Sequence, residues 1–233
     1  MDLKSLPPQF IVFEGIDGAG KTTQLKKLSE LLTDMGIDHI TTREVGGTEM
    51  AEKIRDLMLS DYEEEVSGKT ELLLAFAARE QHLKNTITPA LKAGKWVLCD
   101  RYVDSTYTYQ VVGRNLDNAQ FFDLMVNVVG DMVPNLTLFI DINDNVALKR
   151  RAKRTGGGDR IDNEDPDYFK RVNATMRELG KLPSHKTING EQPVYMVTGD
   201  VIAAINEHAE EVLDAIKKYG SSAIMSDVAS TSS

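Results

Sequence analysis

The chain has 233 residues, which suits one α/β domain with a small mobile lid. Its formal charge of −9 argues against nucleic-acid binding, because proteins that bind nucleic acids carry surplus basic residues to neutralise phosphates. The single cysteine, Cys99, excludes an intramolecular disulfide and favours a reducing, cytoplasmic setting. No apolar run is long enough to cross a bilayer and the N-terminus lacks a secretory pattern, so we expect no membrane partner.

Short apolar runs alternate with amphipathic helical patterns along the chain. The sequence predicts strands at residues 9–14, 37–42, 96–99, 136–141 and 194–197. It predicts helices at residues 21–35, 48–59, 70–91, 105–112, 118–129, 143–154, 165–182 and 201–219. This alternation is typical of a parallel sheet covered on both faces, so we expect a three-layer α/β fold with a five-stranded sheet. Residues 1–220 are expected to form one domain, followed by a disordered serine-rich tail at 221–233.

The turn after the first strand carries a phosphate-binding pattern. Residues 15–22 (GIDGAGKT) fit G-x-x-x-x-G-K-[ST] between a predicted strand and a predicted helix, which is the context this P-loop pattern requires. We expect Lys21 to lie exposed beside the ATP phosphates and the Thr22 hydroxyl to coordinate Mg²⁺. A bare glycine-rich turn is the alternative, but it would not require a lysine and a threonine after the last glycine. The predicted phosphate-binding residues are Gly15, Asp17, Gly18, Ala19, Gly20, Lys21, Thr22 and Thr23.

Asp100 and Arg101 directly follow the third predicted strand. In open α/β sheets ligands bind beyond the carboxyl ends of the strands, so this pair is expected at the same rim as the phosphate loop. We predict that Asp100 holds Mg²⁺ through water and that Arg101 binds a phosphate. An ion pair between the two side chains at the strand end is the alternative.

Together these motifs resemble those of the thymidylate kinase family. The matching segments are FEGIDGAGKTTQ (13–24), TREVGGTEMAEKIRDLML (42–59), AFAAREQH (75–82), DRYVDSTYTYQ (100–110) and DRIDNED (159–165). They occur in the family's order and spacing, within a resemblance that covers about residues 9–215. The resemblance implies a P-loop kinase that uses ATP and Mg²⁺ to phosphorylate dTMP. It also implies a homodimer, with apolar helical surface around residues 70–90 and 118–130 as the candidate interface.

The resemblance implies roles for side chains on the acceptor side. Asp17 would face the acceptor sugar and phosphate, Arg79 the base, and Arg101 the phosphate. Thr106 and Tyr109 would line the base and sugar pocket. The implied acceptor-binding residues are Asp17, Arg43, Phe76, Arg79, Arg101, Thr106, Tyr109 and Gln110.

One branch of the family carries a basic residue inside the P-loop, where this chain has Gly18. The other branch carries catalytic arginines in the lid, here expected at about residues 150–165. The resemblance therefore implies that Arg151 and Arg154 act in catalysis together with Lys21, Asp17 and Arg101. A solvated basic helix end is the alternative for the lid arginines.

Two positions depart from the family pattern. Val45 replaces a proline that often carries a cis peptide bond, so we expect a different local backbone there. Ala75 replaces an aromatic ring that stacks on thymine, and Phe76 is its neighbour. One residue turns a regular helix by ~100°, so Phe76 takes that role only if the helix is irregular. Otherwise the base pocket is altered, and a different or modified deoxynucleoside monophosphate becomes the alternative acceptor.

Two further functions fit the sequence less fully. A deoxynucleoside kinase would use Glu14 or Asp17 as a base toward a sugar hydroxyl, but it needs no arginines for an acceptor phosphate. A P-loop switch module that binds nucleotide with little turnover leaves Arg79 and Arg101 unexplained. The sequence therefore favours phosphoryl transfer to a monophosphate acceptor.

Overall fold

A computed structural model describes residues 3–152 and 158–219 of the protein. In this part of the chain five parallel strands form one sheet. Their order is β2 (His39–Arg43), β3 (Trp96–Asp100), β1 (Phe10–Glu14), β4 (Leu136–Asp141) and β5 (His185–Asn189). The predicted tail at 221–233 and the predicted lid residue Arg154 lie outside the described residues.

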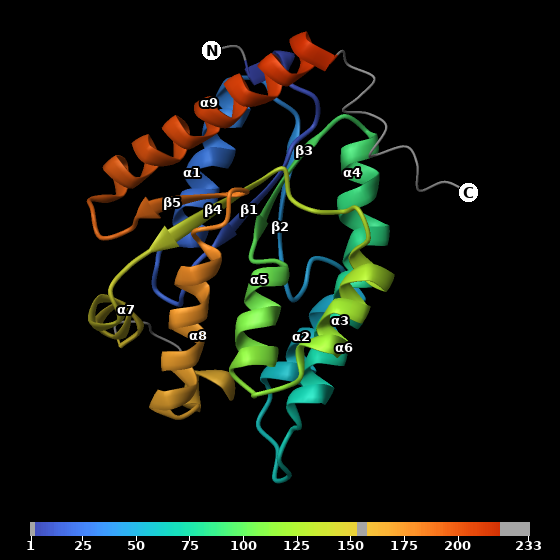
Figure 1. Ribbon diagram of the computed structural model, residues 1–233, viewed down its shortest axis with the longest axis vertical. Helices are drawn as coiled ribbons and strands as arrows, with labels where there is room; N and C mark the ends of the chain where they lie inside the picture. Colours follow the sequence, from blue (N-terminus) through green and yellow to red (C-terminus); the bar gives the residue numbers. More distant parts are fainter. Residues whose placement is uncertain (1–2, 153–157, 220–233) are drawn as a thin grey trace.

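Helices cover both faces of the sheet because its central strands are apolar on both sides. Ile11 and Leu98 pack toward α1 (Lys21–Asp34) and α9 (Val194–Tyr219) in one apolar cluster. Val12 and Cys99, the alternate positions, pack in a second cluster with the helices on the other face. Figure 1 shows α1 and α9 together on one side of the sheet and α4 on the other. The three-layer α/β fold is thereby confirmed.

The remaining helices agree with the predicted segments, although three contain π-helical stretches. The predicted helix 70–91 runs through α3 (Gly68–His82), π-helical η2 (Leu83–Ile87) and α4 (Thr88–Lys92). The other helices are α2 (Glu49–Leu59), α5 (Val103–Thr106), π-helical η3 (Tyr107–Val112), α6 (Asn118–Leu124), π-helical η4 (Met125–Val129), α7 (Asp144–Arg151) and α8 (Pro166–Leu179). Short 3₁₀ turns lie at η1 (Leu3–Ser5) and η5 (Ile161–Asn163). Side-chain caps define several starts; for example, Thr48 and Ser67 accept hydrogen bonds from Ala51 and Thr70.

The predicted fifth strand at residues 194–197 was wrong. Those residues begin α9, where the amides of Met196 and Val197 donate to the Pro193 carbonyl. The actual edge strand, β5, pairs only with β4, and Ile188 is its one fully buried side chain. An edge strand with little buried surface carries a weak apolar signal, whereas the apolar run VYMV at 194–197 contains residues that favour strands and misled the prediction.

The expected backbone difference at Val45 is also not observed, because the Glu44–Val45 peptide bond is cis. Among the described residues no helix is both long and apolar enough to span a bilayer.

Candidate active site

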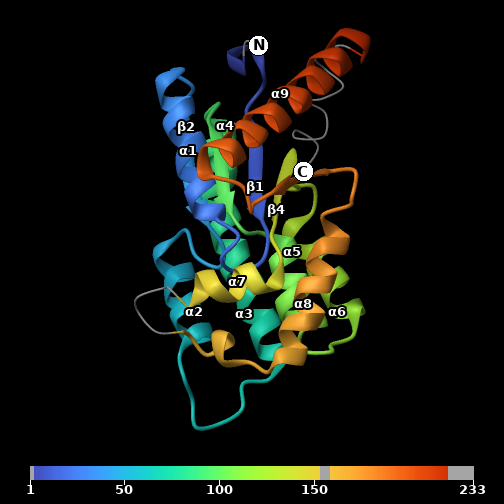
Figure 2. The ribbon, with the colours of Figure 1, turned by 90° about the vertical axis from the view of Figure 1, so that its left-hand side faces the viewer.

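A cavity of about 280 Å³ opens beyond the carboxyl ends of β1 and β3. Its walls come from the phosphate loop, residues 43–59, the segment after β3 and residues 159–162. Helix α7 follows β4 and lies beneath the sheet at this same end (Figure 2). The predicted site residues that line the cavity are Asp17, Lys21, Thr22, Arg43, Asp100, Arg101, Thr106, Tyr109 and Gln110. Among the described residues, the predicted ones that do not line it are Gly15, Gly18, Ala19, Gly20, Thr23, Phe76, Arg79 and Arg151.

The phosphate loop follows β1 directly, and glycines permit its path. Gly15 has φ +140°, and a Cβ there would lie 2.3 Å from the Ile140 carbonyl oxygen. Gly20, with φ +102°, precedes the first residue of α1. Neither conformation is readily open to other residues, so the loop depends on these glycines. The helix start then presents backbone N–H groups toward the cavity end of the sheet, as an anion site requires.

Lys21 is buried, so the expectation that it is exposed was wrong. Its side chain folds back, and the Nζ donates to the carbonyls of Gly15 at 2.9 Å and Ile16 at 3.1 Å. Burial, with Arg101 nearby, lowers the pKa of Lys21 to about 8. The ammonium thus lies inside the loop, where phosphate oxygens would be stronger partners than neutral carbonyls.

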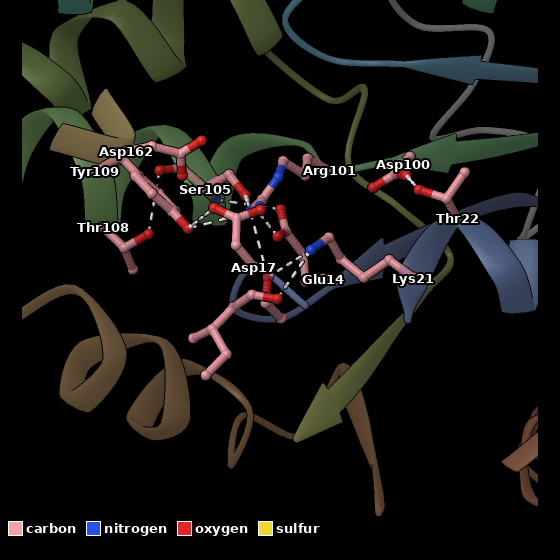
Figure 3. Close-up of polar contacts among 12 residues, drawn as sticks. Glu14, Asp17, Lys21, Thr22, Asp100, Arg101, Ser105, Thr108, Tyr109 and Asp162 are labelled. Carbon is pink, nitrogen blue, oxygen red and sulfur yellow. Dashed lines mark hydrogen bonds and ion pairs between the residues drawn. The ribbon is translucent and has the colours of Figure 1, made fainter. Parts of the chain in front are cut away.

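Thr22 and Asp100 come together across the cavity floor. The Thr22 hydroxyl donates to Oδ2 of Asp100 at 2.5 Å, so oxygen ligands from the loop and from the end of β3 are adjacent. Hard oxygen donors of this kind fit Mg²⁺. Figure 3 shows this pair on one side of the site and the Asp17 cluster in its centre.

Arg101 does not pair with Asp100; its partner is Asp17. The Nη2 atom of Arg101 donates to Asp17 Oδ1 at 2.7 Å, and its Nη1 atom donates to Ser105 Oγ at 2.8 Å. The Tyr109 hydroxyl donates to the other Asp17 oxygen at 3.0 Å. Burial alone would raise the pKa of Asp17, but Arg101 and Lys21 outweigh it and hold that pKa well below its usual range. Asp17, Arg101 and Tyr109 therefore form one charged cluster from two segments (Figure 3).

Glu14 fixes the turn that carries Arg101, a role the sequence did not reveal. Its carboxylate accepts from the backbone amides of Tyr102 at 2.7 Å and Ser105 at 3.2 Å, and from the Ser105 hydroxyl. Arg101 itself has φ +71°, an uncommon conformation for a residue with a side chain. Burial, with Asp104 nearby, raises the pKa of Glu14.

Arg79 lies behind the cavity wall rather than in it. Its Nε donates to Glu44 Oε2 at 2.7 Å, and its Nη2 donates to Thr106 Oγ1 at 2.9 Å. The guanidinium lies between the rings of Phe76 and Tyr102, with its central carbon 4.8 and 5.0 Å from their centroids. Its Nη1 is buried and has no hydrogen-bond partner among the described residues.

The predicted stacking region is closed off from the cavity. Phe76 belongs to regular α3 and packs edge-on against Phe121, so no irregularity redirects it. Ala75 lies on the side of α3 that faces α2 and is buried in one cluster with Ala51 and Met58. The structure thus puts neither residue where a base would lie in the cavity.

Arg55 was missed by the sequence reasoning. It comes from α2, lines the cavity and donates to the Val45 carbonyl at 2.9 Å. Burial, with Arg43 and Arg101 nearby, lowers the pKa of Arg55. The sequence feature that could have indicated Arg55 is its place within the segment 42–59, which matches the family pattern. Arg43, which was predicted, also lines the cavity and pairs with Glu52 at 2.7 Å.

Two arginines end α7 and point to different partners. Arg150 donates to the Gly18 carbonyl of the phosphate loop at 3.1 Å and to the Gly190 carbonyl at 3.0 Å. Arg151, the predicted catalytic residue, stacks on Phe169, with its guanidinium carbon 4.7 Å from the ring centroid. Its catalytic role stays a prediction.

Known proteins resemble this chain in sequence and in fold. A profile of the family described as "Thymidylate kinase" matches residues 13–201. Thymidylate kinases of Teredinibacter turnerae and Haemophilus ducreyi are 41% and 42% identical to the chain, over 84% and 89% of it and 97% of each relative. The crystal structure of thymidylate kinase from Ehrlichia chaffeensis superposes with a TM-score of 0.70, at 29% identity, over 86% of this chain and all of that one. The chain therefore belongs to the thymidylate kinase family.

Proposed function

We propose that the protein transfers the γ-phosphoryl group of ATP to dTMP, giving ADP and dTDP. The observation that carries this proposal is the single cavity shared by a phosphate loop and a buried Asp17–Arg101 pair. One side suits the phosphates of a nucleotide donor, and the other offers cations for a second phosphate. Membership of the thymidylate kinase family indicates that the base of the acceptor is thymine.

On the donor side, the loop amides would bind the ATP phosphates and Lys21 would leave its carbonyl partners to contact the β- and γ-phosphates. Arg150 ties α7 to the same loop through the Gly18 carbonyl. Mg²⁺, when bound, would neutralise charge on the β- and γ-phosphates. The residues that would hold it are Thr22 and, through water, Asp100.

On the acceptor side, Arg101 and Arg55 are the cations that we assign to the dTMP phosphate. Both line the cavity, and Arg101 is already fixed by Asp17 and Ser105. Asp17 and Tyr109 would then face the sugar, while Thr106 and Gln110 line the more distant wall. Arg79 would approach the base from behind this wall through its buried Nη1, which has no hydrogen-bond partner in the part of the chain that the structure describes.

The transfer needs no general base, because the attacking oxygen belongs to an ionised phosphate. That oxygen forms a bond to the γ-phosphorus as the bond to the bridging β–γ oxygen breaks, and ADP leaves with those electrons. Glu14 is bound by Tyr102 and Ser105 and does not line the cavity. Asp17 lines the cavity, but its carboxylate is already paired with Arg101. Neither carboxylate is therefore placed as a free base, which disfavours the alternative of a kinase that deprotonates a sugar hydroxyl. Positioning and charge neutralisation are the protein's contributions.

The lid at about residues 150–165 is part of the proposal. Arg151 would move from Phe169 toward the transferred phosphoryl group, and Arg154 would assist it, so that cationic charge meets the transition state. Closure would also exclude water that otherwise hydrolyses ATP.

We further propose a cytoplasmic homodimer. Exposed apolar side chains gather on α3, α6 and η4: Leu73 is 49% exposed, Phe122 56% and Val126 75%. Such a patch is typical of a protein–protein interface. The free thiol of Cys99 is consistent with a reducing compartment. Sedimentation of the wild type and a Val126→Asp variant tests the dimer, which the variant should weaken.

Release of ADP from Mg-ATP with dTMP, with thymidine or with no acceptor tests the proposed function. We expect rapid release with dTMP alone. Release with thymidine would favour the deoxynucleoside kinase alternative. Release without any acceptor would favour a slow ATPase, and no release under any of the three conditions would favour a switch module.

A further inference from the structure

Glu71 is a buried carboxylate behind the acceptor wall that the mechanism above does not use. It lies on α3, is fully shielded from solvent and does not line the cavity. Arg114 donates to it at 2.7 and 3.2 Å, Arg160 contacts it at 2.9 Å and the Gln110 amide donates to it at 3.4 Å. Removing a carboxylate from water is costly, and these three partners offset that cost.

The contact with Gln110 fixes the direction of that side-chain amide. A carboxylate only accepts hydrogen bonds, so the NH₂ group of Gln110 must face Glu71 and its carbonyl oxygen must face the other way. Gln110 lines the cavity, and no donor among the described residues contacts its carbonyl oxygen. The wall therefore offers an acceptor to the base. Thymine, uracil and guanine carry a ring N–H that can donate to it, whereas cytosine and adenine present a bare ring nitrogen at that edge.

The contact with Arg160 ties residues 158–164 to the same wall. The Arg160 side chain donates to the Met58 carbonyl at 2.8 Å, and its backbone amide donates to the Leu59 carbonyl at 3.3 Å. These two carbonyls belong to the last turn of α2, where backbone carbonyls lack partners within the helix. That turn contains no basic residue that could bind them, so Arg160 supplies the donors. Asp159 and Ile161, on either side of Arg160, line the cavity. Glu71 thus contacts the residue that anchors this part of the wall.

We propose that Glu71 is a positioning residue for the acceptor. It holds the Gln110 amide in one orientation and, through Arg160, holds the 158–164 segment against the pocket. This role rests on the proposed function, because it acts on the monophosphate that the pocket takes. Glu71 touches no substrate itself.

Substitution of Glu71→Gln tests the role, since glutamine keeps the shape but also presents an NH₂ group that lets Gln110 turn round. We measure kcat and KM for dTMP, kcat/KM for dUMP and dCMP, and KM for ATP, below the melting temperature of each variant. The preference for dTMP over dCMP should fall by about tenfold, as expected when one hydrogen bond loses its direction. The preference for dTMP over dUMP should stay constant because both bases share the ring N–H, and KM for ATP should change by less than about twofold.

Arg160→Met is the matched control. It removes the side-chain contacts of Arg160 with Glu71 and with the Met58 carbonyl, whereas the Arg114–Glu164 ion pair and the contact between Glu71 and Gln110 remain. The segment 158–164 should loosen, so the dTMP KM should rise while the dTMP/dCMP preference stays constant. If Glu71→Gln does not fold, Glu71→Asp carries the same test, because it keeps the charge yet is too short to reach Gln110.

An active wild type whose dTMP/dCMP preference is unchanged in the folded Glu71 variant overturns the role of Glu71 alone. A lowered melting temperature with unchanged preference and unchanged dTMP KM also overturns it, since the residue is then only structural. A wild type that does not phosphorylate dTMP overturns the proposed function and this role with it.

Discussion

The donor and acceptor sides of the cavity are held in place by different parts of the chain. On the donor side the contacts are made to the backbone: Ala19 donates to the Ile16 carbonyl, and Lys21 donates to the Gly15 and Ile16 carbonyls. On the acceptor side three buried glutamates hold the wall. Glu14 binds backbone amides of the turn after β3, Glu44 binds Arg79, and Glu71 binds Arg114 and Arg160.

The donor and acceptor sides should therefore tolerate amino-acid substitutions differently. A loop built from backbone groups depends on glycine conformation and on a single lysine, so most of its requirements lie within eight consecutive residues. A wall built from buried ion pairs depends on partners far apart in the chain, and loss of one partner leaves the other charge buried and unpaired. Substitutions on the acceptor side should therefore affect folding and acceptor binding together.

The largest expected effect is on the donor side. Lys21→Ala should lower kcat by about a hundredfold or more, because it removes a preorganised cation from the phosphates. The fold should persist, since the buried ammonium costs rather than adds stability. Lys26→Ala, an exposed lysine on the same helix, is the control and should keep full activity. Near-normal activity in folded Lys21→Ala would mean that the loop does not bind the donor.

Arg101→Ala tests the acceptor side. It should lower kcat/KM for dTMP by about thirtyfold, as loss of a charged hydrogen bond worth ~2 kcal/mol implies, while KM for ATP changes little. The melting temperature should also fall, because Asp17 loses its ion-pair partner. Arg101→Lys keeps the charge but loses the forked pair of donors, so its kcat/KM for dTMP should lie between those of the wild type and Arg101→Ala. Equal losses for both substrates would contradict the assignment of Arg101 to the acceptor.

Arg151→Ala asks whether the lid serves the transition state. If Arg151 leaves Phe169 to neutralise the transferred group, kcat should fall by about tenfold or more, with little change in ATP binding. Phe169→Leu is the control, since it removes the ring under the guanidinium but keeps the charge. An unchanged kcat in Arg151→Ala would make this arginine a solvated helix end.

Ala75→Phe tests the position at which the family pattern has a ring that stacks on thymine. Because Ala75 is buried against Ala51 and Met58, the larger side chain should overpack the α2–α3 contact and destabilise the protein by about 1–3 kcal/mol. Ala174→Phe, on the exposed side of α8 and away from the proposed dimer patch, is the control. Calorimetric unfolding gives both values. Unchanged stability together with tighter dTMP binding would show that the position opens to the pocket after all.

The smallest effect concerns the stability of the ligand-free protein against pH. Burial lowers the pKa of Lys21 to about 8 from its ordinary 10.5. Between these values the unfolded chain holds a proton that the folded protein has released, so unfolding free energy should rise with pH in that window. Lys21→Met should therefore melt a few degrees above wild type at pH 7, with the gap narrowing toward pH 10.5. A gap that does not vary with pH would contradict the buried ammonium.

The two sides also differ in how far the sequence predicts them. The phosphate loop could be identified because glycines, lysine and threonine are contiguous and follow an apolar strand. The contacts of Glu71 could not, since Arg114 and Arg160 lie 43 and 89 residues away and meet it only through the packing of α3 against later segments. Lys21 was predicted to be exposed because the P-loop pattern does not show that the carbonyls of Gly15 and Ile16 accept hydrogen bonds from its ammonium. The edge strand β5 was missed because burial, which produces the apolar signal, is small there.

Phosphorus NMR can follow equimolar Mg-ATP and dTMP with the wild-type protein. If the cavity transfers the γ-phosphoryl group to dTMP, dTDP and ADP should appear together in equal amounts. Signals of inorganic phosphate and ADP with unchanged dTMP, or of neither product, would contradict phosphoryl transfer to dTMP in this cavity.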